Sequence, residues 1–192
     1  QAEAQAIVKL MGGKALVGES ASRENILQQA EQYRYLHLSC HGWFNSTWPM
    51  ASSLELADQP LDMSDVLRLL SLQAELVCLS ACETGRSHVL KGDELIGLAR
   101  AFMYAGTPSV LVSHWVVDEL STRLFMELFY EALLRCQAET SMSPTALALS
   151  RTMSKVREMP YHQLKQWVTA REPERADAML QFWSDSVGLG SI

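Results

Sequence analysis

Apolar residues gather in short continuous runs along this chain, and these runs predict strands. The clearest run, residues 75–79, rises out of a charged start at Glu75 and is followed by small residues and a Thr84-Gly85 turn. An apolar run of this length is typical of a strand buried on both faces. Residues 33–40 and 109–115 are similarly rich in β-forming side chains. We therefore predict three buried strands.

Between these strands, apolar residues follow a helical spacing. Ser20 or Ser22 is expected to cap one helix, which runs to about residue 32, and Asp62 or Ser64 to cap another. The remaining expectations are a short strand near a sheet edge at 15–18, a long loop at 43–59 with a hairpin arm at 54–57, helices at 4–10, 94–104, 118–136, 144–157 and 161–170, and a final apolar segment at 178–187.

Strand and helix alternate at least three times, and such alternation indicates parallel strands joined by right-handed crossovers. The predicted fold class is therefore α/β, with a mostly parallel central sheet and helices on both faces. The chain has 192 residues and no long linker, so we expect a single domain over residues 1–192. Because Gln1 falls inside a predicted helix, we also expect a fragment of a longer chain, with the N-terminal part of the domain and any repeats missing.

Composition narrows the function classes. A hydrophobic content of 48% with 20% charged residues fits a packed globular core. The net charge of −6 argues against direct binding to nucleic acid or to an anionic membrane. No apolar run approaches the roughly 20 residues that span a bilayer, and no signal peptide is visible. The four cysteines lack a CxxC pattern and are expected to be reduced, which predicts a cytoplasmic protein.

Two predicted strands end in residues that can carry out chemistry. His41 precedes Gly42 at one strand end, and Cys82 follows another strand 41 residues later. Parallel strands joined by one crossover are usually neighbours with their carboxyl ends on the same rim, about 4.8 Å apart. This spacing predicts a thiolate–imidazole pair in which Cys82 attacks an acyl carbon and His41 transfers the proton. The backbone N–H groups of Gly42 and Cys82 are expected to hold the developing oxyanion.

The other cysteines and histidines have simpler interpretations. Cys78 lies inside the strand and is expected to be a small core residue. Cys40 is expected to point to the opposite face from His41, because strand side chains alternate. His37, between two leucines, is interpreted as a packed or hydrogen-bonded strand residue.

The motifs around these residues resemble a known family. An apolar strand ending in His41-Gly42, followed by a second ending in Ala81-Cys82, is similar to the clan of caspases, gingipains, legumains and separases. The string Ser-Ala-Cys-Glu-Thr-Gly at 80–85, the stretch 92–102 and Trp-Val-Val-Asp at 115–118 resemble CHAT domains, the caspase-like peptidase modules often attached to TPR repeats. The resemblance covers about residues 15–156. It implies a caspase-like fold, a His41–Cys82 dyad and an oxyanion site at Gly42.

The sequence departs from the family pattern at two places. His114 stands where an apolar residue is common before the Trp. The segment 182–188 is only loosely similar to the Trp-containing strand that usually ends the family's domain.

Residues after the third strand suggest a preference for basic substrates. Asp118 and Glu119 are expected on the same rim as Cys82, and in the related separases an acid at the equivalent place binds the Arg before the scissile bond. A carboxylate there would attract Arg or Lys. The alternative interpretation is that Asp118 caps the following helix. His114 and Trp115 are expected to border this substrate-binding region, with Trp43, Phe44 and Trp48 as further walls of the cleft.

Neither a metal nor a cofactor is expected. His41, Cys82 and His114 could gather near one rim, but no zinc-ligand spacing supports an ion there. The leading hypothesis is a cysteine endopeptidase that acts on a protein or peptide substrate under the control of an upstream TPR or other sensor region. The main alternative is a catalytically silent caspase-like module that serves as a binding platform. A third, a thiol acyltransferase, would require a Gly-rich cofactor loop that is not seen.

Overall fold

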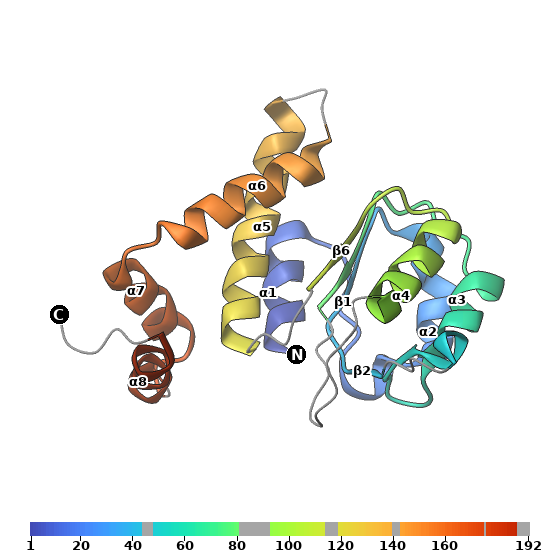
Figure 1. Ribbon diagram of the computed structural model, residues 1–192, viewed down its shortest axis with the longest axis horizontal. Coiled ribbons are helices and arrows are strands. Elements are labelled where there is room, and N and C mark those ends of the chain that lie inside the picture. Colours follow the sequence, from blue (N-terminus) through green and yellow to red (C-terminus); the bar gives the residue numbers. More distant parts are fainter. Residues whose placement is uncertain (44–47, 81–92, 114–118, 140–142, 175, 188–192) are drawn as a thin grey trace. The chain divides into compact units, whose positions relative to one another are not determined.

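Three parallel strands form the central sheet, which a computed structural model places in the order β1-β5-β6 (Figure 1). The strands are β1 (Tyr35–Leu38), β5 (Leu76–Leu79) and β6 (Val110–Val112). The structure describes residues 1–43, 48–80, 93–113, 119–139, 143–174 and 176–187, with residues 49, 93–96 and 182–187 described by their backbone alone.

Eight α-helices are found in the described residues, together with three short 3-10 helices. None of the helices in these ranges is long and apolar enough to cross a membrane. The α-helices are α1 (Ala2–Met11), α2 (Arg23–Gln29), α3 (Met63–Leu69), α4 (Asp93–Tyr104), α5 (Glu119–Glu139), α6 (Pro144–Arg157), α7 (Tyr161–Arg171) and α8 (Ala176–Val187), and the 3-10 helices are η1 (Gly18–Ser20), η2 (Ala30–Gln32) and η3 (Pro49–Ala51).

The chain divides into two compact units, Gln1–Leu149 and Ser150–Ile192. The first contains both sheets and α1 to α5, and the second contains α7 and α8. The single domain over residues 1–192 stays a prediction.

Two helices begin where the sequence places a capping side chain. The hydroxyl of Ser22 accepts a hydrogen bond from the N–H of Asn25 at 3.2 Å and so caps α2. The carboxylate of Asp62 accepts from the N–H of Asp65 at 2.8 Å and caps α3. Each cap satisfies an N–H group that has no partner within the helix.

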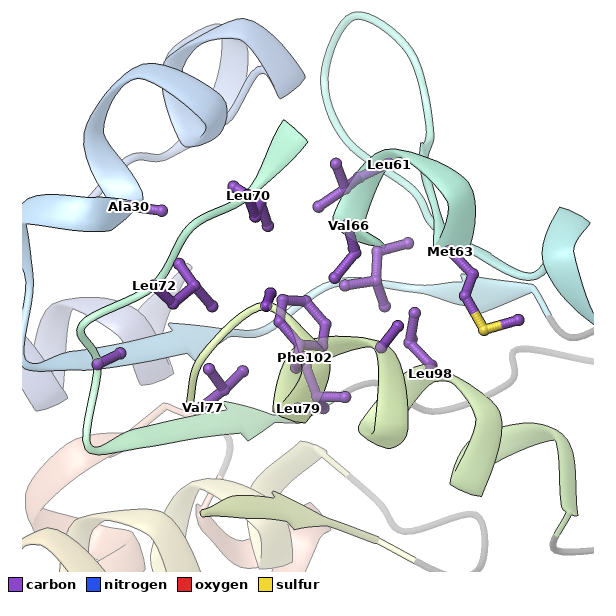
Figure 2. Packing of buried hydrophobic residues seen from close by; sticks show 14 residues of the cluster. Ala30, Leu61, Met63, Val66, Leu70, Leu72, Val77, Leu79, Leu98 and Phe102 are labelled. Atoms are coloured by element: carbon purple, nitrogen blue, oxygen red, sulfur yellow. The ribbon is translucent and has the colours of Figure 1, made fainter. Parts of the chain in front are cut away.

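A large apolar cluster covers one face of the central sheet (Figure 2). Val77 and Leu79 of β5 contribute from the sheet, and Phe102 of α4 lies at the centre of the cluster. Helices α2, α3 and α4 also supply side chains, namely Ile26, Leu27, Met63, Val66, Leu98 and Ala101.

A second cluster covers the opposite face, where α1 and α5 lie side by side (Figure 1). The alternate β5 residues Leu76 and Cys78 point into it and are fully buried. Because successive strand residues point to opposite faces, β5 is buried on both sides, as its continuous apolar run predicts. The predicted α/β class with a parallel sheet between helices is thus confirmed, and the arrangement is compatible with a caspase-like fold.

A small antiparallel sheet overlaps the long loop predicted at 43–59 and extends beyond it at both ends. It contains β2 (Gly42–Trp43), β3 (Ser53–Leu54) and β4 (Leu61–Asp62), in the order β2-β3-β4. Leu54 and Leu61 are fully buried in the first cluster. Two buried leucines therefore fix a segment whose strands are too short to show an alternating pattern.

One other local expectation is wrong. Residues 15–17 form no strand, because none of the strands in the described residues pairs with them, and Gly18 begins η1. The final apolar segment, for which the sequence predicted no type of element, is the helix α8.

His37 of β1 forms a polar connection between the sheet and two helices. Its Nε2 lies 2.8 Å from Oε1 of Glu3 on α1, and its Nδ1 lies 3.2 Å from the hydroxyl of Tyr130 on α5. The His37 and Glu3 side chains are only 8% and 6% exposed. Burial alone would lower the pKa of His37, but its interactions with Cys78 and Glu3 outweigh burial and raise this pKa to about 9. The interpretation of His37 as a hydrogen-bonded strand residue is confirmed.

This ion pair predicts a pH-dependent stability. The folded protein holds the His37 proton more tightly than the unfolded chain, whose histidines titrate near 6.5. The stabilisation is complete below pH 6.5 and is lost as the pH rises through 9, by about 3 kcal/mol at most. The free energy of unfolding, measured with urea at pH 6, 7.5 and 9, should decrease with rising pH in the unsubstituted protein. In His37→Gln this decrease should be smaller.

The matched control is His162→Gln, a substitution of an exposed histidine on α7. It should keep the full pH dependence. Equal pH dependence in the His37→Gln variant and the unsubstituted protein would show that the pair does not stabilise the fold.

Candidate functional site

The candidate site lies at the rim where β1 and β5 end. These strands are direct neighbours and run parallel, with Leu38 opposite Leu79. His41 follows Leu38 by three residues, and Cys82 follows Leu79 by three residues. The expected adjacency of the two strands is confirmed. Cys82 itself lies outside the described residues, so its distance from His41 stays a prediction.

The small antiparallel sheet holds the backbone of His41 in place. The carbonyl oxygen of His41 accepts a hydrogen bond from the N–H of Glu55 at 2.8 Å. The next residue, Gly42, is paired with Leu54, whose side chain is fully buried. The imidazole-bearing residue is thus attached to the core through β3 and is itself exposed.

The same pairing orients the N–H of Gly42. The bond from Glu55 to the His41 carbonyl makes Gly42 and Leu54 a non-hydrogen-bonded pair of the antiparallel ladder. The N–H of Gly42 is therefore directed away from β3 and takes no part in that ladder. An oxyanion donor needs an N–H group outside such a ladder, and the role of Gly42 as this donor stays a prediction.

The first residue after β5 is also tied to β1. The N–H of Ser80 donates to the carbonyl oxygen of Leu38 at 2.9 Å. Both strands thus stay paired up to the point at which the chain continues toward Cys82.

The third strand end lies on the same rim. Val112 of β6 is parallel to β5 and lies opposite Leu79. Glu119 is exposed and is the first residue of α5. At this position the positive end of the helix dipole stabilises its carboxylate. His114, Trp115 and Asp118 lie outside the described residues.

Two of the aromatic residues predicted to wall the cleft are exposed. Trp43 in β2 has an exposed fraction of 49%, and Trp48 one of 72%. Both are in the segment that follows His41. Phe44 lies outside the described residues.

The thiol of Cys40, next to His41, lacks the low pKa that a nucleophile needs. Its side chain is partly buried against the first apolar cluster. Burial, with a contribution from the charge of Glu55, raises the pKa of the Cys40 thiol to about 12. Since the thiolate is the reactive form, Cys40 is unsuited to nucleophilic attack. Cys78 and Cys136 are buried, and neither forms a disulfide.

Within the described part of the chain, no group of three or more His, Cys, Asp or Glu side chains is placed to hold a metal ion. Cys82 and His114, two of the three residues considered for such a site, lie outside it. The expectation that the protein binds no metal and no cofactor stays untested.

One contribution to the site was missed from the sequence. The strand pair β2–β3 positions His41, yet each strand is only two residues long and carries no periodic signal. The available signal was Leu54, an apolar residue between polar neighbours, which is buried in the apolar cluster that also contains Met63 and Val66 of α3.

Comparison with known proteins identifies the family. The family model described as "CHAT domain" matches residues 1–190, almost the whole chain. The chain belongs to the CHAT domain family. The family resemblance that the motifs around Cys82 suggest is thereby confirmed.

Two curated proteins match part of this CHAT domain. The chain is similar to "Tetratricopeptide repeat protein 28" of Mus musculus, with 26% identity over 169 residues, and of Homo sapiens, with 28% over 170 residues. The match covers 69% of this CHAT domain and 7% of each relative. The chain therefore spans a small part of the length of the curated relatives that it matches.

Proposed function

We propose that this CHAT domain is a cysteine endopeptidase with His41 and Cys82 as its catalytic dyad. The observation that carries the proposal is the parallel pairing of β1 with β5, since both residues follow paired positions by the same number of residues. A second support is the exposure of His41 at a rim where Gly42 has its N–H directed away from β3.

The first half of the reaction forms an acyl-enzyme. The Cys82 thiolate attacks the carbonyl carbon of the scissile peptide bond, and the electron pair of the C=O bond moves to oxygen. The N–H groups of Gly42 and Cys82 hold this oxyanion. When the C=O bond re-forms, the C–N bond breaks, and the His41 imidazolium gives its proton to the leaving amine. A thioester on Cys82 remains.

The second half restores the enzyme. Neutral His41 takes a proton from water as the water oxygen attacks the thioester carbon. The C–S bond then breaks, which releases the carboxylic acid product and regenerates the thiolate beside a protonated His41. Cys40, with a pKa of about 12, cannot replace Cys82 in this cycle.

Cleavage after Arg or Lys follows from the acids that precede and begin α5. Asp118 directly precedes Glu119, and Glu119 is exposed at the start of that helix. The strand before them, β6, ends on the rim that also carries His41 and the chain leading to Cys82. A carboxylate at this place would form a charge-assisted hydrogen bond with a guanidinium or ammonium group. We further propose that an upstream TPR or other sensor region regulates the peptidase, and the repeat-protein names of the relatives support this part of the proposal. The proposed compartment is the cytoplasm.

The second candidate is a non-catalytic caspase-like module that serves as a protein-binding platform. The observation that favours it is that both relatives are named for their repeats and not for a reaction. The two candidates differ in whether Cys82 reacts with an acylating substrate.

A reactive peptide probe distinguishes them. An acyloxymethyl ketone peptide ending in Arg should form a covalent adduct with Cys82 in the longest available form of the protein. Mass spectrometry should locate the adduct at Cys82, and His41→Ala should slow its formation by about 10²- to 10⁴-fold.

Cys82→Ala should form no adduct, whereas the control Cys40→Ala should be labelled as fast as the unsubstituted protein. The absence of labelling at Cys82, with and without candidate activating partners, would exclude the peptidase and favour the binding platform.

Charge at the start of α5 should decide specificity. Asp118→Asn should lower kcat/KM for a peptide with Arg before the scissile bond by about 10- to 100-fold, because a charge-assisted hydrogen bond is lost. A peptide with Leu at that position should be cleaved at an unchanged rate. Fluorogenic peptide assays measure both values.

Glu139→Gln is the matched control, because Glu139 is an exposed acid at the opposite end of the same helix. It should leave both peptides unaffected. An unchanged kcat/KM for the Arg peptide in Asp118→Asn would show that Asp118 only caps the helix.

A further inference from the structure

The small antiparallel sheet places an acid beside the proposed base. Its register pairs Gly42 with Leu54. One residue before Gly42, the carbonyl oxygen of His41 accepts from the N–H of Glu55 at 2.8 Å, so His41 and Glu55 lie directly opposite each other. Residues in such a pair have their Cα atoms about 5.5 Å apart and their side chains on the same face of the sheet. The imidazole and the carboxylate are therefore cross-strand neighbours.

Burial shows which face these two side chains share. From His41 through β2 it alternates: His41 is exposed, Gly42 is buried and Trp43 is exposed again. On the opposite strand, Leu54 is fully buried in the first apolar cluster, whereas the next residue, Glu55, is exposed. The shared face of His41 and Glu55 is thus the one turned away from the core, where a substrate can approach.

The carboxylate of Glu55 has its charge at this strand end without a cationic partner from the core. Among the described residues, no Arg or Lys side chain forms an ion pair with it. Its charge acts on this segment, because it contributes to the raised pKa of the Cys40 thiol. In the proposed dyad, His41 becomes a cation when it takes the proton of the Cys82 thiol. A carboxylate on the same face then stabilises the charged ring.

Other groups are proposed near His41 on two further segments. Cys82 follows β5 at the same rim, and Asp118 and Glu119 lie before and at the start of α5. These groups have roles in attack and in substrate binding. The position of Glu55 is set by its backbone pairing with His41, independently of them.

From these observations we propose that Glu55 is a positioning residue for His41. Its carboxylate accepts a hydrogen bond from the ring N–H that is directed away from Cys82. This bond holds the imidazole in one tautomer and stabilises the imidazolium, while the other ring nitrogen exchanges its proton with the thiol and the leaving amine. Glu55 makes and breaks no covalent bond. The pairing of Glu55 with His41 needs no reactive thiol, whereas its catalytic consequence rests on the proposed function.

Nitrogen NMR of the His41 ring tests the pairing in the longest available form of the protein. The measurement uses Cys82→Ala, at a pH where the ring is neutral. Adding Glu55→Gln should change the tautomer ratio of His41 roughly threefold, because an exposed charged acceptor is lost. Glu55→Asp keeps the charge and should retain most of the original ratio. The backbone bond from residue 55 to His41 remains in both variants.

The matched control is Glu31→Gln, a substitution of an exposed acid in η2, before the opposite end of β1. It should leave the tautomer ratio unchanged. In the protein with its thiol, Glu55→Gln should also lower kcat/KM for the Arg peptide about threefold, and Glu55→Asp should restore most of it.

The outcomes separate this role from the proposed peptidase. An unchanged tautomer ratio in Glu55→Gln would overturn the role of Glu55, even where the peptide probe labels Cys82. A changed ratio with an unchanged kcat/KM would overturn the positioning role in the reaction. A changed ratio without labelling of Cys82 would support the pair and exclude the peptidase.

Discussion

The parallel pairing of β1 with β5 is the constraint on which the rest of the structure depends. Both faces of β5 are buried, so a shift of one residue would exchange the side chains that face the two apolar clusters. The register that places Leu38 opposite Leu79 is therefore strongly specified. This register also fixes the strand ends from which the chain continues to His41 and toward Cys82.

The strand β1 and the segment after it carry two imidazoles with different roles, and burial separates them. His37 is enclosed between α1 and α5, where its interactions with Cys78 and Glu3 raise its pKa to about 9. His41 lies beyond the strand end, exposed, with its backbone held by the small antiparallel sheet. The first histidine connects two helices to the sheet, whereas the second, the proposed base, is exposed. Packing can thus fix the position of the proposed base without enclosing its side chain.

The sequence predicts the parts of this fold whose signal is local. The β5 run and the caps at Ser22 and Asp62 are examples, because apolar continuity and capping need only neighbouring residues. Strands β2 to β4 carry no periodic signal, because each is two residues long, and the expected hairpin arm at 54–57 overlaps them only at Leu54 of β3. The burial of Glu3 could not be predicted either, because an acid in a first helical turn is usually exposed. Here its burial depends on contact with His37, which is distant in the sequence. At the site, adjacency of the strand ends follows from topology rules, whereas the positions of Cys82, His114, Trp115 and Asp118 lie outside the described residues.

The central claim is that the imidazole of His41 activates the thiol of Cys82. The most direct measurement is the rate of Cys82 alkylation by iodoacetamide as a function of pH, in the unsubstituted protein and in His41→Ala. A thiolate stabilised by an imidazolium should titrate at least about one unit below the ordinary cysteine pKa of 8.5, and the midpoint should return to that value without the imidazole. The same midpoint in both proteins would contradict the account, because Cys82 would then have no functional contact with His41.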